Sequence, residues 1–253
     1  MIKFFRKTRK RLIRKGKTRK YLKYAIGEIF LVVVGILIAL QINNWNESRK
    51  KTETEVFYLK AIQDEFSKNL KEVEAVMKRN AKNLKTAHSL LNLMGQNDLI
   101  LSEKTFDSLL YGSFISEIEY RPSSGVLTEL VNSGKLGLIS NRDLRLQLAS
   151  WDGLITKVRF QEGEHAKPRY ALIDIMNNLG NGRKSYINAY GNDFDIPNSR
   201  KAESSIILLE NLEFDNQLSL FYLTGSYLNS QYYSKLKDGI SDLLEALKTE
   251  IEK

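Results

Sequence analysis

Few side chains in this chain could do metal or thiol chemistry. The sequence contains two histidines, His88 and His165, and no cysteine, so thiol catalysis and cysteine-based zinc sites are excluded. Glu162-x-x-His165 matches half of the carboxylate-bridged di-iron pattern of helix bundles. Lys85 stands where the second glutamate of that pattern would precede His88. We therefore expect no metal and no other cofactor, and a hydrogen-bonded or solvated His165.

Three loop motifs are weaker still. Asp193-x-Asp195 begins like a calcium loop, but Pro197 occupies the next ligand position. The stretches 133–135 and 180–185 resemble phosphate-binding loops in composition, yet neither has the GxxxxGK[ST] spacing or follows a convincing strand. We interpret all three as surface loops.

Four cations gather in the sequence around the short helices in the middle of the chain: Arg121, Lys135, Arg142 and Arg145. They define a speculative anion site, and the competing interpretation is ordinary charge at helix ends and on solvated faces. No residue qualifies as catalytic, so we expect that the protein is not an enzyme.

These residues belong to a chain organised around an apolar stretch. No polar side chain occurs from Ile29 to Leu40, and residues 22–42 supply the roughly 20 mostly apolar positions that a bilayer requires. Residues 1–24 hold twelve of the 39 basic side chains and no acidic one, which places the N-terminus in the cytoplasm. We predict a basic cytoplasmic segment at 1–21, a transmembrane signal anchor at 22–46 and a periplasmic domain at 47–253.

The basic segment also explains the net charge of +9, because the other 229 residues hold 27 basic and 30 acidic side chains. It is expected to bind anionic lipid headgroups, each basic residue adding about 1 kcal/mol. Nucleic acid is not an expected partner, since no base-stacking pattern accompanies the charge.

A cleaved signal peptide is the main alternative to a retained anchor. Ala39-Leu40-Gln41 lacks the small third residue of a cleavage site, which favours retention. Tyr21, Tyr24 and Trp45 would be the interfacial anchors at the two membrane surfaces.

One face of the predicted span carries Glu28, Gly35 and Ala39. Gly35 and Ala39 form a small-xxx-small pair, which would let a second helix approach closely. Glu28 either uses this protected face or lies shallow, where it is hydrated or paired with Lys23; both interpretations remain open.

The stretch YAIGEIFLVVVGILIALQINNWNESRK, together with MIKFFRK before it, resembles the anchor of a large family of uncharacterised Gram-negative membrane proteins. The stretch SSGVLTELVNSGKLGLISNRDLRLQLASWD is similar to the same family's pattern. The resemblance implies a single-pass protein of the bacterial inner membrane. It implies no activity, cofactor or catalytic residue.

Beyond the span, apolar residues recur in steps of three and four, which indicates a long helix with a heptad seam. Ten of its twelve positions are apolar, and Gln63 and Asn80 are the exceptions. The positions are 56, 59, 63, 66, 70, 73, 77, 80, 84, 87, 91 and 94. The seam could pack within one subunit or between two.

The remaining helices are expected from their caps. Gly95 to Asp98 should end the long helix, and Ser102 should start a helix that reaches about Glu119. A short helix should follow Ser123 or Ser124 and stop at Gly134. Another should start from the capping box Ser140 to Asp143.

Residues 180–200 should form a long mobile or binding loop. The last helix should start at Asp215 or Asn216 and carry a second seam. Its positions are Phe214, Leu218, Phe221, Gly225, Leu228 and Tyr232, followed by Leu236, Ile240, Leu243, Leu247 and Ile251.

The predicted fold class is all-α, with an N-terminal transmembrane helix before an elongated antiparallel bundle of two long and several shorter helices. The leading hypothesis for function is association, either as a homo-oligomer or with an envelope protein partner. A sensory domain that binds a small ligand and signals through another membrane protein is the alternative, and an envelope hydrolase ranks last.

Overall fold

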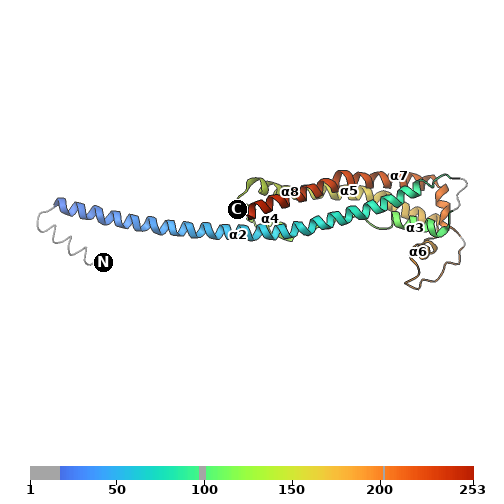
Figure 1. Cartoon of the computed structure of the whole chain (residues 1–253), viewed down its shortest axis with the longest axis horizontal. Helices are drawn as coiled ribbons and strands as arrows, with labels where there is room; N and C mark the ends of the chain where they lie inside the picture. Colours follow the sequence, from blue (N-terminus) through green and yellow to red (C-terminus); the bar gives the residue numbers. More distant parts are fainter. Residues whose placement is uncertain (1–17, 97–100, 202) are drawn as a thin grey trace. The chain divides into compact units, whose positions relative to one another are not determined.

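The computed structural model describes residues 18–96, 101–201 and 203–253, and within these ranges it contains helices and no strand (Figure 1). The prediction of an all-helical chain that begins with a long apolar helix is confirmed. The elements are α2 (Thr18–Leu91), α3 (Glu103–Ser113), α4 (Gly125–Asn132), the 3₁₀ helix η1 (Lys135–Leu138), α5 (Arg142–Leu179), α6 (Gly182–Tyr190), the 3₁₀ helix η2 (Ser205–Glu210), α7 (Leu212–Tyr227), the π-helical turn η3 (Leu228–Tyr233) and α8 (Ser234–Ile251).

The chain divides into two units, Met1–Val56 and Phe57–Lys253. Helix α2 contributes to both, because its 74 residues are continuous. The predicted basic segment 1–21 falls largely outside the described residues.

In the second unit, α2 buries one face at heptad spacing. The predicted positions 59, 66, 73, 80 and 87 are all buried. Of the positions between them, Leu84 is buried as predicted, but two others are shifted by one residue. Leu70 and Met77 are half-buried, whereas Asn69 and Val76 are buried. Because Asn69 is polar, a search for apolar residues places the seam one position away from its true centre.

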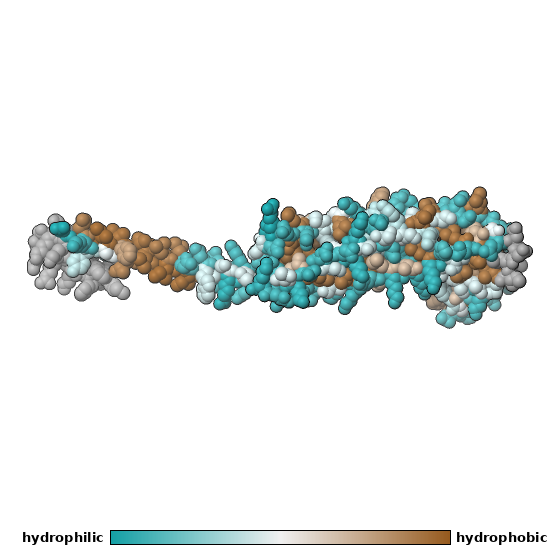
Figure 2. Space-filling model, turned by 45° about the horizontal axis from the view of Figure 1, so that its top comes forward, coloured by the Kyte–Doolittle hydropathy of each residue, from teal (hydrophilic) through white to brown (hydrophobic). Residues whose placement is uncertain are grey.

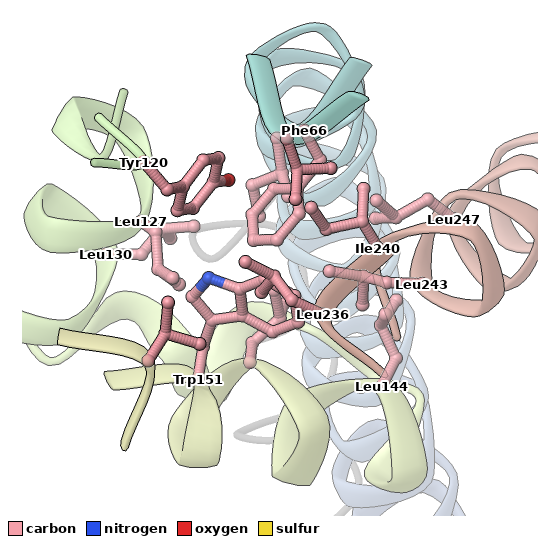
Figure 3. Close-up of a cluster of buried hydrophobic side chains, with 14 of the residues drawn as sticks. Phe66, Tyr120, Leu127, Leu130, Leu144, Trp151, Leu236, Ile240, Leu243 and Leu247 are labelled. Atoms are coloured by element: carbon pink, nitrogen blue, oxygen red, sulfur yellow. The ribbon is translucent and has the colours of Figure 1, made fainter. Parts of the chain in front are cut away.

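Two apolar clusters form the core of the second unit. The first cluster joins the earlier part of this α2 stretch to α4, the start of α5, and α8 (Figure 3). It includes Phe66, Leu127, Leu148, Trp151, Leu236, Ile240 and Leu247. The second cluster joins the end of α2 to α3, the end of α5, and α7, and it includes Leu90, Phe106, Leu110, Leu172, Phe214 and Phe221.

The last helical stretch begins earlier than predicted. Asn211, not Asp215 or Asn216, is its N-cap and accepts a hydrogen bond of 2.7 Å from the Phe214 N–H. The predicted second seam is otherwise buried from Phe214 to Leu247, except that Tyr233 replaces Tyr232, and its last position, Ile251, is half-buried. The π-helical turn η3 adds one residue there, so the buried face steps by five from Leu228 to Tyr233.

The helix after Ser102 ends at Ser113 and not near Glu119. Ser102 caps it as predicted, since its hydroxyl accepts from the Thr105 N–H. The Arg169 guanidinium then binds the carbonyl oxygens of Phe114 and Ile115 at 2.9 and 2.6 Å. These side-chain bonds replace the helical ones, so the chain leaves the helix.

The next helix boundaries follow the predicted pattern with one correction. Ser124 is the N-cap of α4 but makes no side-chain capping bond, and Gly134 ends the segment with a φ of 69°. The cap of α5 is Asn141, not Ser140, because its side chain accepts from the N–H groups of Asp143 and Leu144.

The stretch 180–200 is not one long loop. Helix α6 occupies nearly half of the stretch. Asn181 is its N-cap, and the Asn181 side chain accepts a hydrogen bond from the Lys184 N–H. After Gly191 the chain is irregular, and Asp195 has a φ of 49°. In the predicted turn 95–98, Gly95 has the expected positive φ of 69°, while Asn97 and Asp98 lie outside the described residues.

Candidate functional site

The apolar stretch of α2 is the first candidate site. An 18-residue window near the N-terminus has a mean hydropathy of 2.5, and none of it is buried. Phe30 and Leu31 are each 65% exposed, and Figure 2 shows a continuous hydrophobic surface along this stretch. By length and composition, α2 can therefore cross a membrane, a property that a signal sequence would share.

The predicted association face lies on this stretch, and no element of the described residues covers it. A Cβ added to Gly35 would meet no atom within 4 Å, and Ala39 is exposed. Tyr24 and Trp45 are 64% and 65% exposed, as side chains at membrane surfaces would be. Glu28 is half-buried, and the Tyr21 side chain lies outside the described residues. The roles of these residues stay predictions.

The second candidate is a cleft of about 610 Å³ between α2, residues 122–132 and α5, which we name the α4 cleft. Its floor is apolar and its rim carries hydroxyl, carboxylate and guanidinium groups. The lining residues are Glu65, Phe66, Pro122, Ser123, Ser124, Leu127, Thr128, Val131, Asn132, Leu148, Ala149, Trp151, Asp152, Ile155 and Arg159.

Two buried polar residues of α2 hold α4 in place. The Glu65 carboxylate accepts hydrogen bonds from the N–H groups of Val126 and Leu127, at 2.8 and 3.3 Å. Asn69 donates to the Ser123 carbonyl at 2.7 Å and accepts from its N–H at 2.8 Å. Glu65 thus performs the capping that the Ser124 side chain does not, and its charge suits the positive end of the helix.

A third link ties the end of this segment to α2. The Tyr58 hydroxyl donates to the Glu129 carboxylate at 2.8 Å, and Lys135 Nζ donates to the Tyr58 oxygen at 2.8 Å. Lys135 Nζ also lies 3.6 Å from the Glu129 carboxylate and 5.3 Å from the centre of the Tyr58 ring. The walls of the α4 cleft are therefore fixed at both ends of α4.

The four cations of the speculative anion site bind different partners. Arg121 pairs with Glu117 and Glu119, and Lys135 with Tyr58 and Glu129. Arg145 donates to the Ile139 carbonyl at 2.9 Å, and Arg142 is exposed. The described contacts join none of the four to another, so the anion site stays a prediction without geometric support.

A layer of buried polar side chains separates the two apolar clusters, and we name it the polar layer. It lies between Val76 and Ala87 on α2, between Val158 and Leu172 on α5, and between Phe221 and Leu228 on α7 and η3. Its buried polar members include Asn80, Asn83, Glu162 and His165, and the half-buried Thr224 and the backbone of Gly225 lie beside them.

Glu162 organises one side of the polar layer. Its carboxylate accepts from the Tyr233 hydroxyl at 2.6 Å, the Tyr120 N–H at 2.7 Å and Arg159 Nη1 at 3.2 Å. Arg159 Nη1 also donates to Glu119 at 2.7 Å. Burial raises the pKa of Glu162 although three donors oppose the change. Burial likewise raises the pKa of the Tyr233 hydroxyl, which therefore stays protonated and donates.

His165 occupies the other side of the polar layer, against Phe221 at a ring separation of 4.5 Å. Its Nδ1 lies 3.0 Å from the Thr224 hydroxyl, whose proton goes to the Leu220 carbonyl at 2.8 Å. Nδ1 therefore carries the ring proton, and the buried Nε2 has no partner among the described residues. Burial, and secondarily the charge of Arg169, lowers the pKa of His165 to about 4.

The half motif Glu162-x-x-His165 thus serves packing and hydrogen bonding. His88 is exposed and lies 3.2 Å from the Asn92 amide. Among the described residues, no three of the His, Asp and Glu side chains converge as metal ligands would.

Sequence reasoning missed Glu65, Asn69 and Trp151 as residues of the α4 cleft. The first two are polar residues one helical turn apart within an apolar seam, and that spacing was the available signal.

Comparison with known proteins gives one match. A family model described as "Family of unknown function (DUF6090)" matches residues 28–159, which include most of the apolar stretch and the whole lining of the α4 cleft. No curated protein matches the chain. No solved structure matches it either.

Proposed function

Since the chain belongs to the family of unknown function DUF6090, we propose its role from the structure: a membrane-anchored helical module that acts by association with a second copy or with an envelope protein. The observation that carries this proposal is the apolar stretch of α2. The same helix continues without a break into residues that pack in the apolar core of the second unit. Removing such a surface from water is strongly favourable, and lipid or another apolar helix would do so.

The proposal places the second unit in the periplasm of a Gram-negative bacterium. The basic residues at positions 1–24 support a cytoplasmic N-terminus, and the resemblance of residues 1–50 to the anchor of such proteins supports the membrane. The match of the family model to residues 28–159 is compatible with both.

We also propose that the second unit is an elongated antiparallel bundle. Glu74 pairs with Lys237 at 3.0 Å, and Asn80 donates to the Gly225 carbonyl at 2.9 Å. Residue numbers therefore rise along α2 as they fall from α8 to α7, which is the order expected for antiparallel neighbours.

Association through the span is tested by disulfide crosslinking of the full chain in native membranes. The chain has no cysteine, so single substitutions give an unambiguous signal. Ala39→Cys lies on the predicted face, and Leu37→Cys, about 200° away around the helix, is the matched control. We expect oxidised dimers for Ala39→Cys and not for Leu37→Cys, and fewer when Gly35 is replaced by Ile. Equal crosslinking at both positions, or a monomer without a copurifying protein, would contradict the proposal.

Orientation has a separate test. A phosphatase reporter that is active only in the periplasm, fused after Lys253, should be active in whole cells. Activity restricted to a cytoplasmic reporter at the same position would reverse the topology.

A further inference from the structure

The α4 cleft has the properties of a built ligand site. Its volume of about 610 Å³ lies within the range of small-molecule sites, and its walls are held by the bonds of Glu65 and Asn69 to α4. The floor is rigid as well, because the Phe66 and Trp151 rings meet edge to face at 4.8 Å. A ligand would therefore enter a preformed apolar space.

Trp151 brings an unused hydrogen-bond donor to this space. The side chain is 8% exposed and lines the cleft, and its indole N–H donates to no group of the described residues. Figure 3 shows the indole nitrogen on the side of the ring that faces Tyr120 and Leu127, away from Leu144. The indole N–H is not one of the fully buried polar atoms that lack a partner, so it is open to the cleft, where a ligand carbonyl can accept from it.

The charges on the rim favour one class of ligand. Glu65 is engaged by the N–H groups of α4, and Arg159 is engaged by the carboxylates of Glu119 and Glu162. Asp152 is exposed at the rim and makes no described hydrogen bond or ion pair. The charge that remains uncompensated is therefore negative, which favours cations and disfavours anions.

We propose that the α4 cleft binds a small amphipathic cation with an apolar body, a carbonyl that accepts from the Trp151 N–H, and an ammonium group near Asp152. A short apolar peptide with a free amino terminus has all three features. The site is independent of association through the span, because it is lined only by residues between 65 and 159.

The test uses the full chain in nanodiscs with Trp45→Phe, so that Trp151 is the only tryptophan of the two in the sequence. The probes are phenylalanyl-leucinamide, a cation; its N-acetylated form, which is neutral; and N-acetyl-phenylalanyl-leucine, an anion. We expect saturable changes of Trp151 emission with the cation, about tenfold weaker binding of the neutral probe, and no saturation by the anion up to about 10 mM.

Two matched substitutions locate the site. Ala149→Phe fills the α4 cleft from an exposed position and should abolish the saturable signal, whereas Ser150→Phe, also exposed but outside the lining, should leave it unchanged. Asp152→Asn should make the cationic and neutral probes bind equally, through loss of about tenfold in affinity for the cation.

The outcomes that overturn the proposal are equally definite. They are no saturable binding of any probe, equal affinity for the cation and the anion, or binding that Ala149→Phe does not reduce. Failure of this test leaves the crosslinking result at Ala39 unaffected, so ligand binding in the α4 cleft and association through the span are tested independently.

Discussion

The two apolar clusters and the polar layer between them are built on the same helices but stabilise them by different interactions. In the clusters, Phe66, Ile240 and Phe214 are almost fully buried among apolar neighbours. In the polar layer, Glu162 and His165 are also buried, but they depend on hydrogen-bond partners in specific directions. Cluster contacts tolerate small displacements, whereas hydrogen bonds of 2.6–3.0 Å do not.

The difference teaches how register is fixed in this chain. A seam of apolar residues alone can slide by one heptad with little loss, whereas a buried polar residue must meet its partner. Asn80 donates to the Gly225 carbonyl of α7 and Asn229 of η3 donates to the Met77 carbonyl, so α2 is held in a single register against α7 and η3.

The largest effect is expected in the clusters. Ile240→Ala removes a fully buried side chain from the first cluster and should lower the free energy of unfolding by about 3–4 kcal/mol. The loss should be the same at pH 7.5 and pH 5, since no titrating group is involved. Urea unfolding of the solubilised chain measures it, and Ile207→Ala, 54% exposed, is the control. A loss of unfolding free energy that changes with pH would contradict the prediction that the apolar clusters stabilise the fold independently of titrating groups.

Glu162→Ala should cost about 2–3 kcal/mol, because the Tyr233 hydroxyl and the Tyr120 N–H would lose their acceptor while remaining buried. Glu162→Gln keeps one acceptor oxygen and should cost less than half as much. Thermal unfolding at pH 7.5 compares the two. Equal losses for both variants would show that the volume of the side chain matters and its hydrogen bonds do not.

The polar layer should also make stability depend on pH through His165. Its pKa is about 4 in the folded chain and about 6.5 when unfolded, so the unfolded state binds more protons below pH 6.5. Stability from this residue is complete above pH 6.5 and is lost as the pH falls, by about 2 kcal/mol at pH 5. His165→Leu should remove this loss, measured by unfolding at pH 7.5 and pH 5. The exposed His88→Leu should keep it. An unchanged pH profile in His165→Leu would contradict the assignment.

Close packing in the polar layer gives the smallest predicted effect. A Cβ at Gly225 would lie 2.8 Å from His165 Cε1 and 2.8 Å from Leu84 Cδ2, so Gly225→Ala should destabilise by about 1–2 kcal/mol. Gly163→Ala, where a Cβ meets nothing within 4 Å, should stabilise the helix by about 0.5–1 kcal/mol. Thermal unfolding separates the two signs, and stabilisation by Gly225→Ala would show that the layer is loosely packed.

Periodicity and caps predicted much of this fold, because they depend on neighbours in the sequence. The apolar stretch, the buried positions Leu59, Phe66 and Val73, and the stop at Gly134 all follow from local pattern. The early end of α3 does not, since Arg169, 55 residues beyond Phe114, takes the carbonyl oxygen there.

The α4 cleft escaped prediction for the same reason. Phe66, Leu127 and Trp151 come from three separate elements, and only tertiary packing brings them together at the floor of the cleft. The pattern of apolar residues did not identify Glu65 and Asn69, because a buried helix face is recognised in a sequence by its apolar residues. In the structure their polarity is what positions α4.

The π-helical turn at Leu228–Tyr233 has a consequence for how the chain tolerates changes of length. Loss of one residue within a regular α-helix rotates everything that follows by about 100° and would turn the buried face of α8 toward solvent. Loss of one residue inside η3 would instead restore ordinary helical spacing between Leu228 and the next buried position. This turn is therefore the place where α7 and α8 can shed a residue and still present the same side chains to α2.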